Sequence, residues 1–226
     1  KKKMLNVREK LSLMQQLEAR KIREESDKFG KQVEDFRTMF QKTAPVTVAA
    51  STIKVDDVRP AYDILDHFHH GEKDDKFIFG SLSTIATEAS ALNEKQELFE
   101  LHVSDYLALQ RSAEDLAFLK ALWDMASSVI FTFDSWNITL WNAIDVEFLM
   151  DETKKLAKEV KMLPKGCRAY DLYKILEDQV KALLTSLPLV SELHHPSMRE
   201  RHWKQLMKAT GRHFVMDDKF SLGDLL

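Results

Sequence analysis

The sequence predicts an all-α protein, an elongated array or bundle of amphipathic helices joined by short loops. Of the 226 residues, 44% are hydrophobic and 31% are charged, which is enough apolar material to form a packed core. Only six glycines and five prolines are present, and this scarcity of turn-forming residues disfavours an all-β sandwich. Apolar residues recur every three or four positions along most of the chain, which is the spacing of helices buried on one face.

The first predicted helix covers Leu5 to Lys42. Its apolar residues recur at helical spacing amid dense mixed charge: Val7, Leu11, Met14, Ile22, Phe29, Val33, Phe36 and Phe40. Glu18 and Glu25 interrupt this stripe, which disfavours a sustained coiled coil. Gly30 costs roughly 1 kcal/mol relative to alanine inside a helix, so we expect a bend or break there.

An extended connection is predicted for about residues 43–58, where proline and β-branched residues replace the helical period. A short helix is then expected to begin at Arg59 and Pro60, because proline is tolerated in the first turn, and to end at Gly71. We expect a charged loop at residues 72–76.

Five more helices are predicted from the same apolar spacing, over about residues 82–99, 116–133, 148–163, 172–187 and 195–210. Proline and glycine set their limits: Pro164 ends the third, Pro188 closes the fourth, Pro196 opens the last, and Gly211 is its expected C′ residue. No repeat of fixed period is present, so the sequence does not support a regular solenoid.

The charge and cysteine content exclude several classes of function. The formal net charge is −3, so no global field draws the protein to nucleic acid or to an anionic membrane, and neither is expected as a partner. The single cysteine cannot form an internal disulfide, which fits a reducing compartment. No run of eighteen apolar residues and no signal peptide is found, so we expect a soluble protein. We also expect a fragment, because the first residue is not methionine and the last ones lie in an apolar run.

We predict no catalytic, cofactor-binding or metal-binding residue in this chain. Gly71 and Gly80 are the closest pair of glycines, and they are too far apart in sequence to build a loop that cradles phosphate. Cys167 lies beside Arg168, a cation that could activate a thiol. No base or oxyanion hole accompanies it, so a structural cysteine is the preferred interpretation.

Two groups of histidines invite a metal-binding interpretation. His67, His69 and His70 lie among carboxylates, but only the first and third share a helix face. Histidines at a helix C-terminus are also favoured by the helix dipole, so a structural role is preferred. The second group, His194, His195 and His202, lacks the HExxH spacing of a metalloprotease.

A basic patch in the last predicted helix could contact phosphates, with Trp203 as a stacking surface for a base. It consists of Arg199, Arg201, His202 and Lys204. Glu200 interrupts the patch, so we prefer a solvated helix face to a nucleic-acid site.

Large apolar side chains at helical spacing predict the structural core. A buried tryptophan covers on the order of 200 Å², so core packing is preferred to a ligand cage for these residues. The predicted core residues are Trp123, Trp136, Trp141, Phe148, Leu176, Trp203 and Leu206.

The second half of the chain resembles the dynein heavy chain at the start of its linker. The residues that carry the resemblance are Glu97-Leu98-Phe99, Leu119-Lys120-Ala121-Leu122-Trp123, Trp136, Trp141, Leu163-Pro164-Lys165, Leu187-Pro188-Leu189-Val190, Leu193, Met198-Arg199-Glu200-Arg201-His202-Trp203 and Thr210-Gly211. They cover about Leu92 to Leu226, and their order also agrees. The Glu97-Leu98-Phe99 segment and the pair Trp136 and Trp141 resemble axonemal chains more than cytoplasmic ones.

The resemblance implies a non-catalytic fragment of a microtubule motor of the cilium or flagellum. Residues 1–110 would be a helical tail segment, and residues 111–226 would start the linker that passes ATP-driven conformational change on as force. The parent chain would be an ATP-hydrolysing AAA+ motor that needs ATP and Mg²⁺, but neither cofactor would bind this fragment.

The implied partners differ between the two halves. Dynein intermediate and light chains, or a sister heavy chain, would dock on the tail half, because an amphipathic helix buries its apolar face on a partner. The AAA+ ring of the same chain would meet the linker half, and microtubules would be contacted only through other parts of the chain. The implied location is the axoneme of a cilium or flagellum, which is part of the cytoskeleton.

Two other classes remain open from composition alone. A helical adaptor or spectrin-like scaffold without a motor would show the same apolar stripes, and it would continue into further helices rather than into GxxxxGK loops. A metal-dependent hydrolase that uses the histidines is the less favoured of the two, because nucleophile, base and ligands do not converge in the sequence.

Overall fold

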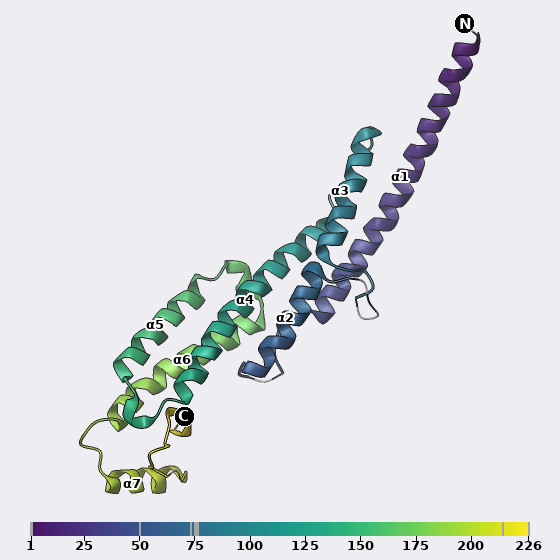
Figure 1. Ribbon diagram of the computed structural model, residues 1–226. Coiled ribbons are helices and arrows are strands. Elements are labelled where there is room, and N and C mark those ends of the chain that lie inside the picture. Colours follow the sequence, from purple (N-terminus) through teal and green to yellow (C-terminus); the bar gives the residue numbers. More distant parts are fainter. Residues whose placement is uncertain (1, 50, 73, 75–76, 214, 226) are drawn as a thin grey trace. The chain divides into compact units, whose positions relative to one another are not determined.

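The computed structural model describes residues 2–49, 51–72, 74, 77–213 and 215–225, with side chains from Val7 onward. These residues form eight α-helices and two 3-10 helices, and they contain no strand beyond an isolated antiparallel bridge between Leu140 and Ser221 (Figure 1). The predicted all-α class is confirmed. The elements are α1 (Lys2–Thr43), α2 (Val55–His70), α3 (Leu82–Leu98), α4 (Leu107–Asn137), η1 (Trp141–Ala143), α5 (Val146–Met162), η2 (Lys165–Ala169), α6 (Asp171–Leu193), α7 (Glu200–Thr210) and α8 (Leu222–Leu225).

The chain divides into two compact units. Unit 1 comprises Lys1–Pro45 and Ala61–Phe118, and unit 2 comprises Val46–Pro60 and Leu119–Leu226. Helices α2 and α4 each contribute residues to both units. The boundary predicted near residue 110 is a division by role, between tail and linker. The compact units are defined by contacts alone, so they do not test this boundary, and it stays a prediction.

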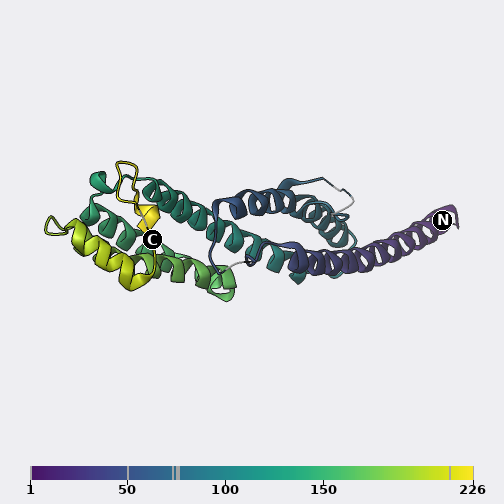
Figure 2. The ribbon, with the colours of Figure 1, turned by 90° about the horizontal axis from the view of Figure 1, so that it is seen from below.

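Unit 1 is built on one face of α1, whose buried side chains are Ile22, Phe29, Val33, Phe36 and Phe40. Helix α3 packs on this face, and Phe68 of α2 meets the Phe40 ring at a centroid distance of 4.8 Å. The predicted break at Gly30 is wrong, because α1 is one uninterrupted helix (Figures 1 and 2). Burying a phenylalanine contributes about 1.5–3 kcal/mol, which exceeds the roughly 1 kcal/mol that a helical glycine costs.

Helix α2 begins at Val55 rather than at Arg59, so the extended connection is shorter than predicted. The Lys54 backbone N–H donates to Asp57 Oδ2 at 2.8 Å, and this contact caps the first turn. Asp56 and Asp57 also place negative charge where the helix dipole favours it. The helix ends before Gly71 as predicted, but part of the charged loop predicted for residues 72–76 lies outside the described residues.

Unit 2 has its core between α5, α6 and the part of α4 that begins at Leu119. Helices α5 and α6 lie side by side (Figure 1), and Leu119, Leu122 and Trp123 of α4 are at most 1% exposed. By length and hydropathy alone, α4 is a candidate membrane span. Although Phe131 is 54% exposed, five large apolar side chains of α4 in unit 2 are at most 3% exposed, as in a core helix: Leu119, Leu122, Trp123, Val129 and Ile130.

Helix α6 continues through Pro188 to Leu193, so the end predicted at this proline is wrong. A proline inside a helix costs about 3 kcal/mol. Leu187 and Val190 flank it and are at most 2% exposed, and their burial contributes about 1.5–3 kcal/mol each. Burial therefore offsets the cost of the proline. The apolar spacing of the sequence alone does not give the size of this burial term.

Helix α7 begins at Glu200 rather than near His195. Instead of opening the helix, the preceding residues form a turn in which Met198 N donates to His195 O at 2.9 Å. The Arg199 backbone N–H then donates to His202 Nδ1 at 3.1 Å, which satisfies the residue before the first turn.

Candidate functional site

Four ring systems meet in unit 2 and form what we call the aromatic cluster: Trp141, His194, Trp203 and Phe220. The centroid of Trp141 lies 5.2 Å from that of His194 and 5.6 Å from those of Trp203 and Phe220. The first two contacts are edge-to-face, at interplanar angles of 70° and 83°. Such pairs contribute about 0.5–1.5 kcal/mol beyond their buried area. The cluster therefore ties η1, the end of α6, α7 and the C-terminal residues together.

Backbone hydrogen bonds fix the cluster from two sides. His194 Nε2 donates to the Trp141 carbonyl at 2.9 Å, and the Trp141 backbone N–H donates to Phe220 O at 2.8 Å. The Leu222 backbone N–H donates to Thr139 O at 3.0 Å. These bonds satisfy the backbone around a ring system that excludes water, where an unpaired group would cost about 1–3 kcal/mol.

Helix α7 depends on Trp203, which is its one buried residue. Gly211 follows the helix with a φ of 69°, and its backbone N–H donates to Met207 O at 2.9 Å. This left-handed residue confirms the C′ glycine predicted from sequence, because a residue with a side chain is strained there.

The C-terminal segment, residues 217–225, packs against α4. Phe220 and Leu222 are at most 3% exposed. A Cβ placed on Gly223 would lie 2.9 Å from the Asn137 carbonyl oxygen, so glycine is required for this close approach. Hydrogen bonds from the backbone N–H and the hydroxyl of Ser221 lower the pKa of Asp224, which stands at the start of α8.

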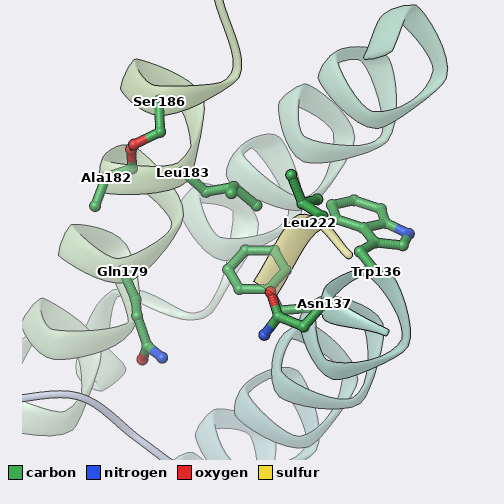
Figure 3. A pocket seen from close by; sticks show the side chains of 8 residues that line it. Trp136, Asn137, Gln179, Ala182, Leu183, Ser186 and Leu222 are labelled. Atoms are coloured by element: carbon green, nitrogen blue, oxygen red, sulfur yellow. The ribbon is translucent and has the colours of Figure 1, made fainter. Parts of the chain in front are cut away.

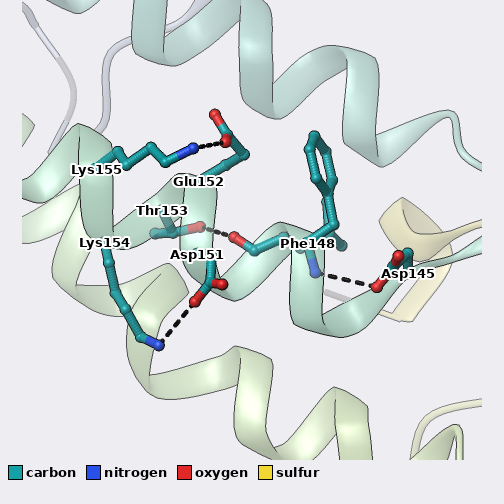
Figure 4. A network of polar contacts seen from close by, with 8 residues as sticks. Asp145, Phe148, Asp151, Glu152, Thr153, Lys154 and Lys155 are labelled. Atoms are coloured by element: carbon teal, nitrogen blue, oxygen red, sulfur yellow. Dashed lines mark hydrogen bonds and ion pairs between the residues drawn. The ribbon is translucent and has the colours of Figure 1, made fainter.

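The other predicted core residues divide into two groups. Trp123, Trp136 and Leu176 are at most 9% exposed, and Leu206 is half-buried. Phe148 does not lie in the core: it is 54% exposed (Figure 4).

The cap of α5 explains the position of Phe148. Its backbone N–H donates to Asp145 Oδ1 at 3.0 Å, which fixes where the helix begins. Val146 and Leu149 then take the buried positions, and Phe148 points off that stripe. Ion pairs on the same helix, Lys154 with Asp151 at 3.0 Å among them, are exposed and contribute little stability (Figure 4).

A groove runs beside α6 in unit 2. Its first part has a volume of about 270 Å³, with Trp136 of α4, Leu222 of α8 and Leu183 of α6 in its lining (Figure 3). Gln179 lies at one end of this first part and also forms hydrogen bonds with Ile53, in the connection before α2. Its side chain accepts from Ile53 N at 3.1 Å and donates to Ile53 O at 3.0 Å, as a neighbouring strand would.

Residues 109–226, more than half of the chain, match the family described as "Dynein heavy chain, N-terminal region 2". The chain belongs to the dynein heavy chain family. It is 55% identical over all 226 residues to the dynein beta chain of the flagellar outer arm of Chlamydomonas reinhardtii. It is also 34% identical to a ciliary dynein beta chain of Tripneustes gratilla and 33% identical to dynein axonemal heavy chain 11 of Sus scrofa. All of the chain is covered in each comparison, but only 5% of each relative.

The predicted family and its axonemal type are therefore confirmed, and this dynein chain spans a small part of the relatives that it matches. The aromatic cluster lies inside the matched region, and so do α5, α6 and the groove. Most of unit 1 lies before it, although the three relatives align over the full chain.

Two of the candidate histidines, His67 and His194, pack against aromatic rings. His67 stacks on Phe77 at a centroid distance of 3.8 Å, and its Nε2 lies 3.8 Å from Asp74 Oδ2. His194 belongs to the aromatic cluster. Among the residues that the structure describes, no group of three histidine, cysteine, aspartate or glutamate side chains is placed to hold a metal ion.

Burial of Cys167 and an ion pair beside the basic patch both bear on the chemistry considered for these residues. Cys167 is fully buried in η2, and burial raises the pKa of its thiol, which disfavours the nucleophilic thiolate. In the basic patch, Lys204 pairs with Glu200 at 2.6 Å on the exposed face of α7. A hydrogen bond from Lys204 lowers the pKa of Glu200, so the acidic residue stays charged beside the patch.

Sequence reasoning missed a buried polar network in unit 1. Gln96 Nε2 donates to Ser26 Oγ at 2.8 Å and to Ser104 Oγ at 3.1 Å, and Ser26 lies 3.0 Å from Tyr106 OH. The network fastens the loop before α4 to α1, although Tyr106 has a φ of 40°. Ser26 and Gln96 stand at apolar-stripe positions of their helices, and that polar exception was the available signal.

Proposed function

We propose that this region of the dynein heavy chain transmits force and carries no catalysis of its own. In this proposal residues 1–110 are the end of the tail, and residues 111–226 form the start of the linker that moves with the nucleotide state of the motor. The family match of residues 109–226 supports the position of the second part.

The aromatic cluster is the observation that carries the proposal. An element that transmits force must not dissipate it by bending, and densely packed interiors are poorly compressible. Trp141, Trp203 and Phe220 join three separate segments through rings that are at most 8% exposed. That arrangement suits a stiff segment.

The tail half is proposed to bind dynein intermediate and light chains or a sister heavy chain. Helix α1 supports this, because Val7, Leu11 and Met14 are each more than half exposed on one face of it. The linker half would face the AAA+ ring of the same chain. ATP, Mg²⁺ and microtubules would be bound by other parts of the heavy chain, within the axoneme of a cilium or flagellum.

The test is a heavy chain of natural length that carries Trp203→Ala. We expect ATP-driven gliding of microtubules to slow markedly while nucleotide binding is retained, because the proposal assigns nucleotide binding to other parts of the heavy chain. Gln205→Ala is the matched control, since it removes an exposed side chain from the same helix. Gliding at the control speed, despite a released α7, would refute the role of the cluster in force transmission.

A helical scaffold without a motor is the second candidate function. The exposed stripe on α1 favours it, because such a stripe needs only a binding partner. The relatives of this chain are named as dynein chains, which favours the motor. A complete polypeptide without nucleotide-binding modules would decide for the scaffold.

A further inference from the structure

The second half of α6 is the one long stretch of this helix without charge. Residues 182–191, Ala-Leu-Leu-Thr-Ser-Leu-Pro-Leu-Val-Ser, contain no acidic or basic side chain, whereas the preceding residues 171–181 contain five. Leu187 and Val190 face the core of unit 2, but Leu189 is 59% exposed. A helix that is apolar on both sides is normally buried on both sides.

The exposed side of this stretch lines two neighbouring hollows, which together form the groove beside α6. The first part of the groove and a second part of about 340 Å³ share Ser186. The second part is lined by Leu189 and Leu193 of α6, Leu206 of α7 and Leu225 of α8. From Gln179 to Leu193 the groove follows α6 for about 21 Å, at 1.5 Å per residue.

The end of α8 lies in the wall of the same groove. Leu222 lines its first part and Leu225 its second, so polypeptide attached after residue 226 would start beside the second part. The three relatives are far longer than this chain, of which it covers 5%, and the matched region is described as N-terminal. A segment tethered this close has an effective concentration in the millimolar range, which favours it over a separate molecule.

We propose that the groove beside α6 is filled by the segment of the heavy chain that follows residue 226, packed along Ala182 to Leu193 as an amphipathic helix. Ala182 and Ser186 are small side chains one turn apart, which lets another helix approach α6 closely. A second copy of this chain fits less well, because in a two-fold contact the same concave strip would face itself. The proposal depends on family membership and not on force transmission.

The experiment uses the heavy chain of natural length with the photo-crosslinking residue p-benzoylphenylalanine in place of Leu189. This position is exposed, so the replacement leaves the core of unit 2 intact. The matched control carries the same residue in place of Lys181, whose side chain is 55% exposed and lies on the charged face of α6. After illumination, mass spectrometry identifies the crosslinked peptide.

The expected result is a crosslink from position 189 to a peptide that begins soon after residue 226, at least about tenfold stronger than from position 181. A crosslink to an accessory chain, to a second heavy chain or to a remote part of the same chain would overturn the proposal, and so would the absence of any crosslink from position 189. The readout does not involve motility, so it can fail or succeed independently of the proposed function.

Discussion

Replacing Trp203 with alanine removes the ring on which α7 depends. The side chain is 7% exposed and meets the Trp141 ring edge-to-face at 5.6 Å. A buried tryptophan covers about 200 Å², and losing roughly 150 Å² of that at about 25 cal/mol per Å² gives about 4 kcal/mol. Tryptophan-to-alanine changes in cores cost about 3–5 kcal/mol, which agrees with this value.

Thermal unfolding of the 226-residue chain, followed by circular dichroism, measures the loss. A change of 1 kcal/mol shifts the unfolding midpoint by about 2–4 °C for a chain of this size, so we expect a fall of about 8–16 °C. Hydrogen exchange should show α7 as the first region to lose protection, because Trp203 is its one buried residue.

Gln205→Ala in the same helix is the control for this measurement. The side chain is exposed, so its removal should shift the midpoint by no more than about 2 °C. An unchanged midpoint and unchanged protection of α7 in Trp203→Ala would show that the ring does not hold the helix, and the argument from the aromatic cluster would be wrong.

Three further changes test the C-terminal segment and the Gln179 contact. Gly223→Ala should release residues 217–225, at a cost of about 1–3 kcal/mol, because the new Cβ meets the Asn137 carbonyl; hydrogen exchange of the segment would show it. Gln179→Leu leaves the buried backbone groups of Ile53 unpaired and should lower the free energy of unfolding by about 2–4 kcal/mol, measured in urea. The lowered pKa of Asp224 means that docking of the segment is favoured above about pH 4 and weakens as the pH falls through that pKa. Asp224→Asn should abolish this pH dependence of the protection factors, which are the exchange rates corrected for the intrinsic rate at each pH.

Each of these changes has its own control or contradicting result. Gly30→Ala places a Cβ in open space inside a helix, so it should stabilise the chain by about 0.5–1 kcal/mol, opposite in sign to Gly223→Ala. A urea midpoint of Gln179→Leu equal to that of the parent would mean that the contact with Ile53 is replaced by water. Protection factors of residues 217–225, which are corrected for the intrinsic pH dependence of amide exchange, that are the same at pH 3 and pH 6 would contradict the role given to Asp224.

Helix faces were predictable because each residue's burial follows from local spacing. The stripes of α3 and α6 are buried as the apolar period indicates, and so is the stripe of α1 from Ile22 onward, whereas Val7, Leu11 and Met14 are exposed. Gly211 ends α7 because only a left-handed residue fits there. Pro60 and Pro188 misled the prediction of helix limits, since the balance between a proline and the burial of its neighbours is set by tertiary packing. The acidic pair Asp56 and Asp57 did signal the true start of α2.

The site was predictable in part. Trp141 and Trp203 were expected in the core, but nothing local indicates that Phe220 joins them or that Gln179 reaches Ile53. Phe148 shows the opposite error, because a large apolar residue is exposed when a cap places the helix register one position away from it. Contacts between residues far apart in sequence leave no periodic signature, so they require the structure.

The bond between Ile53 and Gln179 also constrains how the chain is made. Its partners are 126 residues apart, and the residues of unit 1 from Ala61 to Phe118 are synthesised between them. At about 5–20 residues per second, a nascent chain exposes the apolar Ile53 for roughly 6–25 s before its partner is translated. Segment 46–60 therefore cannot take its final position until Gln179 has been synthesised, so unit 2 can be completed only late in translation.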